Sequence, residues 1–305
     1  MSEDSIVIIG SGAVACVFAA RLSAAGIFVK MLASWQEAVI AIRKNGVRLI
    51  SPDGSEQAYP AEIVTDPYAL GSVMHAIVLV KSWQTVRAAE QLTCCLAADG
   101  IVLTLQNGLG NEEILGEALG YERVAAGISV LGASLVAPGQ VRTTGNEEVK
   151  VVEHQKLAFI IYALEKANIR VAQSREITPI LWGKLVANLA INPLSAILQC
   201  KNGDLLTNPD AKYILEKLAN EASEVAQALQ IRLPYDDPVE NVRRIIRKTP
   251  DNLSSMLQDR LRNAPTEIEA ITGSLLKYAQ IAGVDALVNQ TIYQLMKAII
   301  AVGKA

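Results

Sequence analysis

The sequence has little of several residue types on which common kinds of site depend. Only two histidines, His75 and His154, occur in 305 residues, and neither lies near a polar cluster. We read both as structural or exposed, so we expect no zinc site, and acid–base chemistry would have to come from lysine or carboxylate side chains. The four cysteines have no CxxC spacing, and we interpret the adjacent Cys94 and Cys95 as reduced core residues within a helix.

Basic tracts and uninterrupted apolar runs are also missing. Lys and Arg number 28 against 31 Asp and Glu, giving a net charge of −3, and no basic stretch is interleaved with aromatic residues. This balance argues against a nucleic-acid partner. The acidic start Met1–Asp4 is not typical of a signal peptide, and the apolar stretch 181–198 is interrupted by Lys, two Asn and Pro, which argues against a membrane span. We therefore expect a cytoplasmic protein.

Phenylalanine is scarce as well, with three in the chain, although 51% of the residues are hydrophobic. The core should therefore consist mainly of Ala, Leu, Ile and Val, and a chain of this length is expected to form two domains. Short apolar strand patterns alternate with helical patterns up to about residue 174, and every later periodic segment is helical. We predict an α/β Rossmann-type dinucleotide-binding domain at 1–174 and an all-helical substrate and catalytic domain at 175–305.

A glycine-rich turn follows the first predicted strand. The run Gly10-Ser11-Gly12-Ala13-Val14-Ala15 comes directly after the apolar segment Ser5–Ile9 and opens an alanine-rich helix, and Phe28–Leu32 reads as the next strand. In this context a G-x-G-x-x-A pattern predicts a dinucleotide site, although a tight turn without a ligand is the alternative. The first glycine permits the turn, the second lets the backbone approach a pyrophosphate, and the small third residue lets helix and strand pack closely.

The end of the second predicted strand does not decide which dinucleotide binds. An acid there would favour the ribose hydroxyls of NAD, and an arginine would favour the 2′-phosphate of NADP. The chain has Ala33-Ser34-Trp35-Gln36-Glu37 at this place. Ser34 and Glu37 fit a capping box for a helix running to about Lys44. Ser34 could contact either cofactor.

Two further strand patterns end in polar or glycine-rich sequence. Lys81 follows the apolar run Ala76–Val80, and Gln106-Asn107-Gly108-Leu109-Gly110 follows Ile101–Leu105. A solvated lysine and a plain turn are the alternative interpretations. Because ligands of doubly wound sheets bind at the carboxyl ends of the strands, their shared placement favours a pocket at that edge.

A narrow polar stripe runs along an otherwise apolar helix in the second half of the chain. Lys184, Asn188 and Asn192 are spaced four residues apart, and Ser195 follows three residues later. At about 100° per residue these side chains share one helix face. A solvated face is the alternative, but exposed faces favour charged residues over short amides. The stripe therefore predicts a ligand pocket with a desolvated lysine as proton donor, and Pro193 should kink the helix there.

Two later helix starts carry polar residues. Asn252 and Ser255 flank one start, where simple capping is the alternative to ligand binding. Glu267 lies in the first turn of another helix, and Glu269 could complete a capping box with Thr266.

Taken together, these motifs resemble those of the ketopantoate reductase (2-dehydropantoate 2-reductase) family over nearly the whole chain. The resemblance is carried by Gly10–Ala15, Val80-Lys81, Gln106–Gly110, Leu181-Trp182-Gly183-Lys184, Asn188, Asn192-Pro193-Leu194, Asn202-Gly203-Asp204-Leu205, Ser254–Asp259 and Thr266-Glu267-Ile268. It implies a Rossmann domain and a helical domain of the 6-phosphogluconate dehydrogenase-like C-terminal type, with the active site in the cleft between them. It also implies NADPH-dependent reduction of ketopantoate to (R)-pantoate on the route to pantothenate and coenzyme A.

The resemblance also implies a role for each matched residue. Lys184 would be the general acid, and Glu267 would orient it and help place the cofactor or substrate. The substrate would contact Asn107, Asn188, Asn192, Asn202, Asn252 and Ser255. The cofactor, NADP with NAD as the alternative, would contact Gly10, Ser11, Gly12, Ala13, Val14, Ala15, Ser34, Lys81, Asn107 and Glu267.

Other functions remain open at this point. A related enzyme could reduce a different 2-oxo acid or join one to an amine, and a dinucleotide-binding sensor could regulate a partner without catalysis. The apolar faces of the helical domain could support a homodimer. The expected partner of the site is a small 2-oxo acid.

Overall fold

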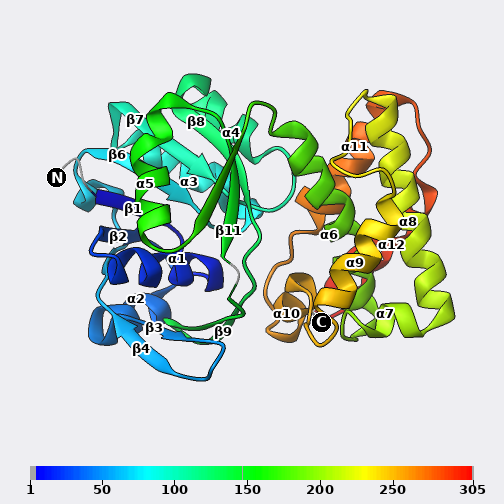
Figure 1. Ribbon diagram of the computed structural model, residues 1–305, viewed down its shortest axis with the longest axis horizontal. Helices are drawn as coiled ribbons and strands as arrows, with labels where there is room; N and C mark the ends of the chain where they lie inside the picture. The colour runs from blue at the N-terminus through cyan, green and yellow to red at the C-terminus, as the bar shows by residue number, and fades with distance from the viewer. Residues whose placement is uncertain (1–4, 146, 304–305) are drawn as a thin grey trace. The chain divides into compact units, whose positions relative to one another are not determined.

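The computed structural model describes residues 5–145 and 147–303, so the predicted acidic start Met1–Asp4 lies outside the described residues. The chain forms two compact units (Figure 1). The sheet unit comprises Met1–Gln106 and Asn111–Ile177, and the helical unit comprises Asn107–Gly110 and Thr178–Ala305. The short segment Asn107–Gly110 therefore belongs with helices that follow it by some 70 residues, which no feature of the sequence indicated.

The sheet unit contains an eight-stranded sheet in the order β12-β11-β8-β7-β6-β1-β2-β5. Neighbouring strands are parallel except for the antiparallel pair β8 and β11. The order changes direction at β1, as in doubly wound nucleotide-binding folds. The strands are β1 (Ser5–Ile9), β2 (Phe28–Leu32), β5 (Glu62–Val64), β6 (Val73–Val78), β7 (Leu96–Thr104), β8 (Val124–Ser129), β11 (Glu148–Val152) and β12 (Arg170–Ser174).

Helices cover both faces of this sheet, because alternate residues of each strand point to opposite sides. In β1, Ile6 and Ile8 join one hydrophobic cluster with residues of α1 and α5, whereas Val7 and Ile9 join another with residues of α3 and α4. The predicted α/β class is confirmed by this arrangement. The helices are α1 (Ala13–Ala24), α2 (Gln36–Asn45), α3 (Thr85–Thr93), α4 (Asn111–Leu119) and α5 (Ala158–Lys166).

A second, four-stranded sheet in the order β4-β3-β10-β9 packs on α1. Its strands are β3 (Val47–Ile50), β4 (Glu56–Tyr59), β9 (Ala133–Ala137) and β10 (Gln140–Thr143). Although its strands come from the part of the chain predicted to form the Rossmann-type domain, they do not join the main sheet: β10 pairs with β3 in parallel and with β9 as a hairpin. Sequence periodicity identifies a strand but carries no record of its partner.

The helical unit is built around the long helix α6 (Thr178–Leu198). It is surrounded by α7 (Asp204–Thr207), α8 (Pro209–Ala228), α9 (Pro238–Lys248), α10 (Ser255–Leu261), α11 (Ser274–Ala282) and α12 (Leu287–Val302). Among the described helices, α6 is the one long and apolar enough to cross a membrane, but 72% of its most apolar window is buried within the structure. It is therefore the core helix of this unit, and it continues unbroken through Pro193.

Three local predictions are corrected by the structure. Helix α2 begins after Trp35 with no side-chain cap, so the Ser34–Glu37 capping box is wrong. Glu269 does not cap the helix with Thr266, because its carboxylate accepts from the Tyr293 hydroxyl at 2.6 Å and pairs with Lys297 on α12. Cys94 and Cys95 are free thiols beyond the end of α3, and Cys94 is exposed rather than part of the core.

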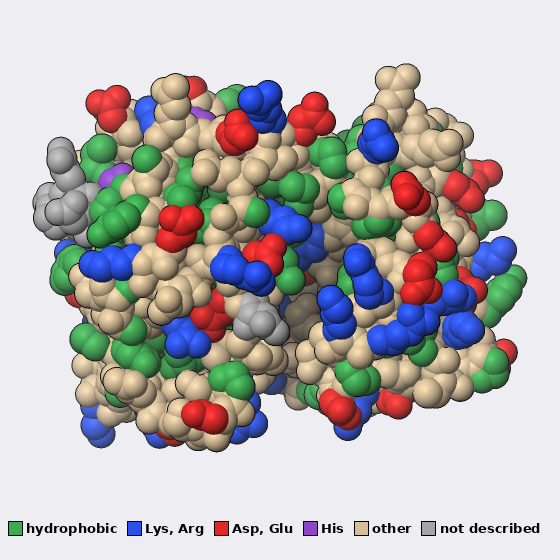
Figure 2. Space-filling view, viewed as in Figure 1, with side chains coloured by type: hydrophobic (Ala, Val, Ile, Leu, Met, Phe, Trp, Pro, Cys, Tyr) green, Lys and Arg blue, Asp and Glu red, His purple; other side chains and the backbone are tan. Residues whose placement is uncertain are grey.

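Lysine and arginine side chains gather over α9 on one face of the helical unit (Figure 2). They are not a free basic patch. Arg243 pairs with Glu216 on α8 at 2.5 Å, and Arg247 pairs with Glu240 one helical repeat earlier at 2.7 Å. The first pair joins α9 to α8, the second lies within α9, and both partly neutralise the surface.

One buried ion pair in the sheet unit allows a stability prediction. The Glu147 carboxylate is almost fully buried and accepts from Arg21 at 2.8 Å and from the Thr143 hydroxyl at 3.1 Å. Glu147→Ala should destabilise the sheet unit by about 3 kcal/mol, because it leaves the Arg21 charge unpaired. The exposed neighbouring pair Glu153–Arg175, at 3.6 Å, supplies the control: Glu153→Ala should cost less than about 1 kcal/mol. Urea unfolding of both variants measures the difference, and equal losses would contradict the prediction.

Candidate active site

The glycine-rich turn is held between the ends of two strands of the sheet unit. Gly10 N–H donates to the Leu32 carbonyl at the end of β2, at 2.9 Å. Gly10 adopts a φ of +126°, and a Cβ there would lie 3.2 Å from the Val80 nitrogen after β6. Only glycine combines this backbone conformation with so close an approach. The turn is thereby fixed at the carboxyl edge of the sheet, as predicted for a dinucleotide site.

The next residues of the turn leave room for an anion. A Cβ on Gly12 would meet nothing within 4 Å, and no side chain caps the start of α1 within the described residues. The first backbone N–H groups of a helix are not used within the helix and favour negative charge. An open, uncapped helix start beside a tight glycine turn fits the pyrophosphate of a dinucleotide. Gly10, Ser11, Gly12, Ala13, Val14 and Ala15 would hold it.

The segment that follows the end of β2, Ser34–Glu37, is exposed and has no basic side chain. Ser34, Trp35 and Glu37 are all exposed at the start of α2. The Ala33 N–H bonds the Val64 carbonyl at the end of β5, and the exposed Asp66 follows two residues later. Within the sheet unit this is where a doubly wound fold receives the adenosine ribose.

The ends of β6 and β7 are joined by a buried polar network that sequence reasoning missed. The Gln106 amide donates to the Val80 carbonyl at 3.0 Å and to the Thr85 hydroxyl at 2.8 Å. The Thr85 hydroxyl also bonds Asn111 at the start of α4 at 2.8 Å. Lys81 lies half-buried at this edge, before a 3-10 turn at Ser82–Gln84. The signal in the sequence was the polar residue Gln106 directly after an apolar strand.

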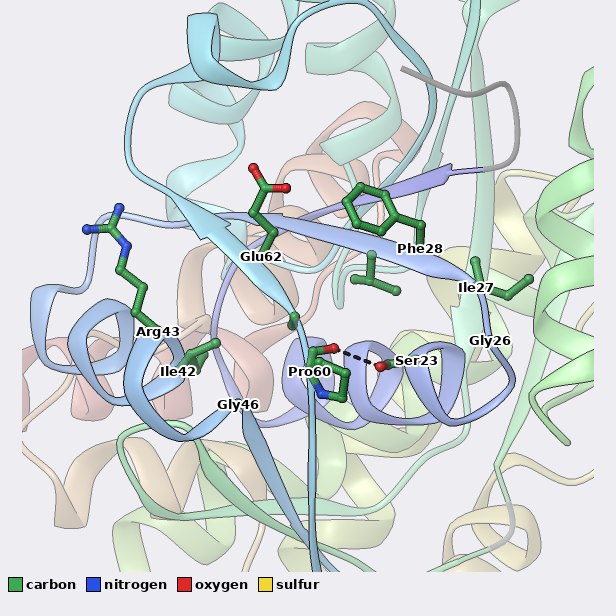
Figure 3. A pocket seen from close by; sticks show the side chains of 11 residues that line it. Ser23, Gly26, Ile27, Phe28, Ile42, Arg43, Gly46, Pro60 and Glu62 are labelled. Carbon is green, nitrogen blue, oxygen red and sulfur yellow. Dashed lines mark hydrogen bonds between the residues drawn. The ribbon is translucent and has the colours of Figure 1, made fainter.

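A shallow groove of about 560 Å³ lies at the other edge of the sheet (Figure 3). It is lined by Gly26 and Phe28 at the start of β2, with Ser23 donating to the Pro60 carbonyl at 2.7 Å beside it. Because the glycine-rich turn stands at the carboxyl end of β1, this groove is distinct from the candidate dinucleotide site.

In the helical unit, two neighbours fix the turn of α6 that carries Lys184. Trp182 is buried, and its ring meets Tyr278 edge-on at 5.4 Å. Gly183 packs so closely on Pro234 that a Cβ would lie 2.7 Å from that ring, and the Tyr235 hydroxyl donates to the Gly183 carbonyl at 3.1 Å. The Trp-Gly-Lys run therefore places Lys184 on a rigid part of the helix.

Lys184 lies close enough to the buried carboxylate of Glu267 for the two charges to interact. Burial lowers the pKa of Lys184 from its ordinary 10.5 to about 8, and Glu267 opposes part of this effect. Removal from water disfavours the ammonium, whereas the carboxylate favours it. Glu267 itself is 4% exposed and accepts from the Asn107 amide at 3.2 Å. The structure thus brings Lys184, Glu267 and Asn107 together within the helical unit.

A second group of polar side chains joins α6 to the start of α10. The Asn192 amide donates to the Ser255 hydroxyl at 3.5 Å. One turn later, the buried hydroxyls of Ser195 and Ser254 are 2.7 Å apart. The sequence placed Ser195 on the polar stripe but gave it no role, and it gave none to Ser254. Ser254 also caps α10, accepting from Leu257 N–H at 3.2 Å.

Asn202 and Asn252 extend this second group. Asn202 N–H donates to the Asn252 carbonyl at 3.0 Å, and its amide donates to the Thr249 hydroxyl at 3.2 Å. The Oδ1 atom of Asn202 is buried and has no hydrogen-bond partner among the described residues. Because a buried acceptor without a donor is costly, this atom is suited to accept a hydroxyl from a ligand. Asn188 is half-buried on α6, one turn from both Lys184 and Asn192.

A doubly wound sheet with an open glycine turn, next in sequence to a helical unit in which a half-buried lysine interacts with a buried carboxylate, defines a two-domain protein of the dinucleotide-dependent oxidoreductase class. Residues 6–156 match the family described as ketopantoate reductase PanE/ApbA, and residues 176–300 match its C-terminal region. The chain therefore belongs to the ketopantoate reductase family, and the family assignment made from the sequence is confirmed.

Individual relatives match the sequence of this chain over nearly their full lengths. The chain is 31% identical to the 2-dehydropantoate 2-reductase of Vibrio cholerae, covering 96% of this chain and 97% of that one. It is 30% identical to the enzyme of the same name from Archaeoglobus fulgidus, covering 98% and 99%.

Solved structures agree as well. A PanE/ApbA family ketopantoate reductase from Ralstonia eutropha superposes with a TM-score of 0.92 at 30% identity, covering 99% of this chain and 100% of that one. A D-mandelate dehydrogenase, solved with NADH and anilino(oxo)acetate, has the same TM-score and coverage at 24% identity, which shows the shared fold.

The lysine–carboxylate pair predicts a measurable titration. Lys184 should gain reactivity toward an amine reagent as the pH rises through about 8, because its neutral form appears there. Glu267→Gln should move this pKa lower, since the carboxylate raises it. Trinitrobenzenesulfonate labelling at graded pH, read by peptide mass spectrometry, measures both. Lys201, exposed and paired with Asp251 at 3.0 Å, is the internal control whose titration should not change in the variant. A Lys184 titration near 10.5 would contradict the assignment.

Proposed function

We propose that this protein reduces ketopantoate (2-dehydropantoate) to (R)-pantoate, with a nicotinamide dinucleotide as cofactor and Lys184 as general acid. The observation that carries the proposal is the pairing of half-buried Lys184 with buried Glu267 on a helical unit whose fold and sequence match ketopantoate reductases. The product lies on the route to pantothenate and coenzyme A, and we place the enzyme in the cytoplasm. We assign the dinucleotide to the domain predicted at 1–174 and the substrate to the domain predicted at 175–305. The homodimer remains a prediction.

Lys184 supplies the proton that the reaction needs. A bound nicotinamide dinucleotide, reduced, provides a hydride for the 2-oxo carbon of the substrate. The Lys184 ammonium donates a hydrogen bond to the 2-oxo oxygen, and this contact strengthens as negative charge develops there. With a pKa of about 8, Lys184 is mostly protonated at pH 7. The group is therefore charged before the reaction and acidic enough to release its proton to the alkoxide oxygen.

Glu267 keeps Lys184 from losing its proton too early. Burial alone would lower the Lys184 pKa further, and the nearby carboxylate moves it back up. The Asn107 amide, donating at 3.2 Å, satisfies one Glu267 oxygen and fixes its direction. Held in this direction, the carboxylate orients the Lys184 ammonium. Because the Asn107 amide is uncharged, it adds no further charge to the site.

The uncharged donors of the second group suit a hydroxylated 2-oxo acid. Asn252 and Ser255 can donate hydrogen bonds to the substrate carboxylate, so that binding it needs no second cation beside Lys184. Asn188, Asn192 and Asn202 would hold the hydroxyl end of the substrate, and the partnerless Oδ1 of Asn202 supplies an acceptor for that hydroxyl. A 2-oxo acid without a hydroxyl would leave this buried acceptor unsatisfied, which disfavours its binding.

The end of β2 bears on the choice between the two dinucleotides. Family resemblance implies NADP, whereas this chain has Ser34 where an arginine would hold the 2′-phosphate. Glu37 and Asp66 are exposed near the same strand ends, and the nearest arginine on α2, Arg43, is in its last turn and donates to the Ile63 carbonyl at 3.1 Å. Carboxylates repel a phosphate and tolerate a ribose hydroxyl. We therefore infer that NADH serves at least as well as NADPH.

The function is tested by oxidation of NADH and of NADPH with ketopantoate, followed at 340 nm. Lys184→Ala should lower kcat by about 10²–10⁴-fold, the usual contribution of a general acid, while the Kd for the dinucleotide stays close to that of the wild type. Lys201→Ala removes an exposed lysine of the same unit and is the control. A better 2-oxo acid than ketopantoate would overturn the substrate. Dinucleotide binding without turnover of any 2-oxo acid would favour the alternative function, a dinucleotide-binding sensor without catalytic activity.

The cofactor preference is tested by calorimetry as well as by rate. Ser34→Arg should tighten NADPH binding by about 10-fold or more, because an arginine–phosphate hydrogen bond contributes about 1.5–3 kcal/mol, and NADH affinity should change little. Gln290→Arg adds the same charge on an exposed part of α12 and should change neither Kd. Wild-type protein that binds NADPH more than about 10-fold tighter than NADH would contradict the inference, since it would require another phosphate-binding residue.

A further inference from the structure

The segment Asn107–Gly110 makes an unusually close backbone contact inside the helical unit. Gly108 has a φ of +85°, and a Cβ there would lie 2.7 Å from both the Ala270 Cβ and the Ala270 carbonyl carbon. The next residue, Leu109, donates its N–H to the Ala270 carbonyl at 3.1 Å. Glycine is thus required at 108 by conformation and by space.

Ala270 can accept this bond because it lies in a π-helical turn, Glu269–Gly273. In an α-helix the Ala270 carbonyl would accept from the Ser274 N–H, four residues later. Here the Ser274 N–H reaches the carbonyls of Glu269 and Ile271 instead. The Ala270 carbonyl is then taken by Leu109 N–H and by the Ser274 hydroxyl, at 2.6 Å. The π-turn therefore creates the place where the segment attaches.

The attachment lies next to the Glu267 carboxylate. Glu267 precedes Ala270 by three residues, and Asn107 precedes Gly108 by one. With Gly108 against Ala270, the Asn107 amide reaches Glu267 Oε2 at 3.2 Å. Because Glu267 also raises the Lys184 pKa, its position affects the proton donor.

We propose that Gly108 is a positioning residue: its contact with Ala270 at the π-turn holds Asn107 against Glu267 and so keeps Glu267 in place beside Lys184. The inference rests on the proposed function for its catalytic consequence. Gly108 itself touches neither substrate nor cofactor in this role, and a side chain of any size would force the segment away from the helix. The segment is short, so a displacement at Gly108 moves Asn107 by a similar distance.

The test compares two glycines of the same segment. Gly110 has a φ of +92° but nothing within 4 Å of a Cβ, so Gly110→Ala carries similar backbone strain without the collision. Gly108→Ala should lower kcat by about 100-fold, as expected for a misplacement of about 1 Å. Gly110→Ala should keep kcat close to wild type. Equal kcat losses in the two variants would overturn the proposal.

Hydrogen exchange at the Leu109 amide gives a measurement that does not depend on turnover. This amide should exchange slowly in the wild-type protein and in Gly110→Ala, and rapidly in folded Gly108→Ala, because its acceptor is the Ala270 carbonyl. Fast exchange in the wild type would overturn the proposal, even if Gly108→Ala did not fold. If the wild type reduces no 2-oxo acid, the proposed function fails, and slow exchange at Leu109 still supports the contact.

Discussion

The proposed reaction depends on how the positive charge of Lys184 is maintained on the largely apolar helix α6. Burial lowers the lysine pKa to about 8, and the Glu267 carboxylate limits the fall. Without burial the ammonium would hold its proton more strongly, and without the carboxylate its pKa would fall further. Much of the helical unit serves this balance. Trp182 and Gly183 fix the helix turn, and the Asn107 amide fixes the carboxylate.

In both units a glycine allows a close backbone contact, although the two contacts place different polar groups. In the sheet unit, Gly10 lets the turn approach the ends of β2 and β6, so that an uncapped helix start faces open space. In the helical unit, Gly108 lets a loop approach a π-turn, so that an amide meets a buried carboxylate. In each case a glycine permits a backbone contact that a side chain would prevent, and the contact places polar groups that interact with charge.

Much of the fold and part of the candidate site could be predicted because they depend on local pattern. The apolar strands β1 and β2 were placed with their observed bounds, since buried parallel strands are short β-branched runs. The stripe of Lys184, Asn188 and Asn192 follows from helical periodicity alone. Three features could not be predicted: the partner of β10, the exposed position of Cys94 outside α3, and the absent caps at Ser34 and Thr266. Each depends on a neighbour distant in sequence or on competition for one side chain. The Glu269 carboxylate, for example, is bonded by Tyr293 and Lys297.

The sequence by itself determined the alternation of strands and helices, the glycine turn, the polar stripe on α6 and the family, because these are properties of spacing and residue type. Only the tertiary structure decided that Asn107–Gly110 belongs to the helical unit, that Ser195 meets Ser254, and that Glu267 is buried within reach of Lys184. The physical reason is that a hydrogen bond or a pKa shift depends on distance and on exclusion of water. Residues 160 positions apart, such as Asn107 and Glu267, acquire these only when the chain has folded.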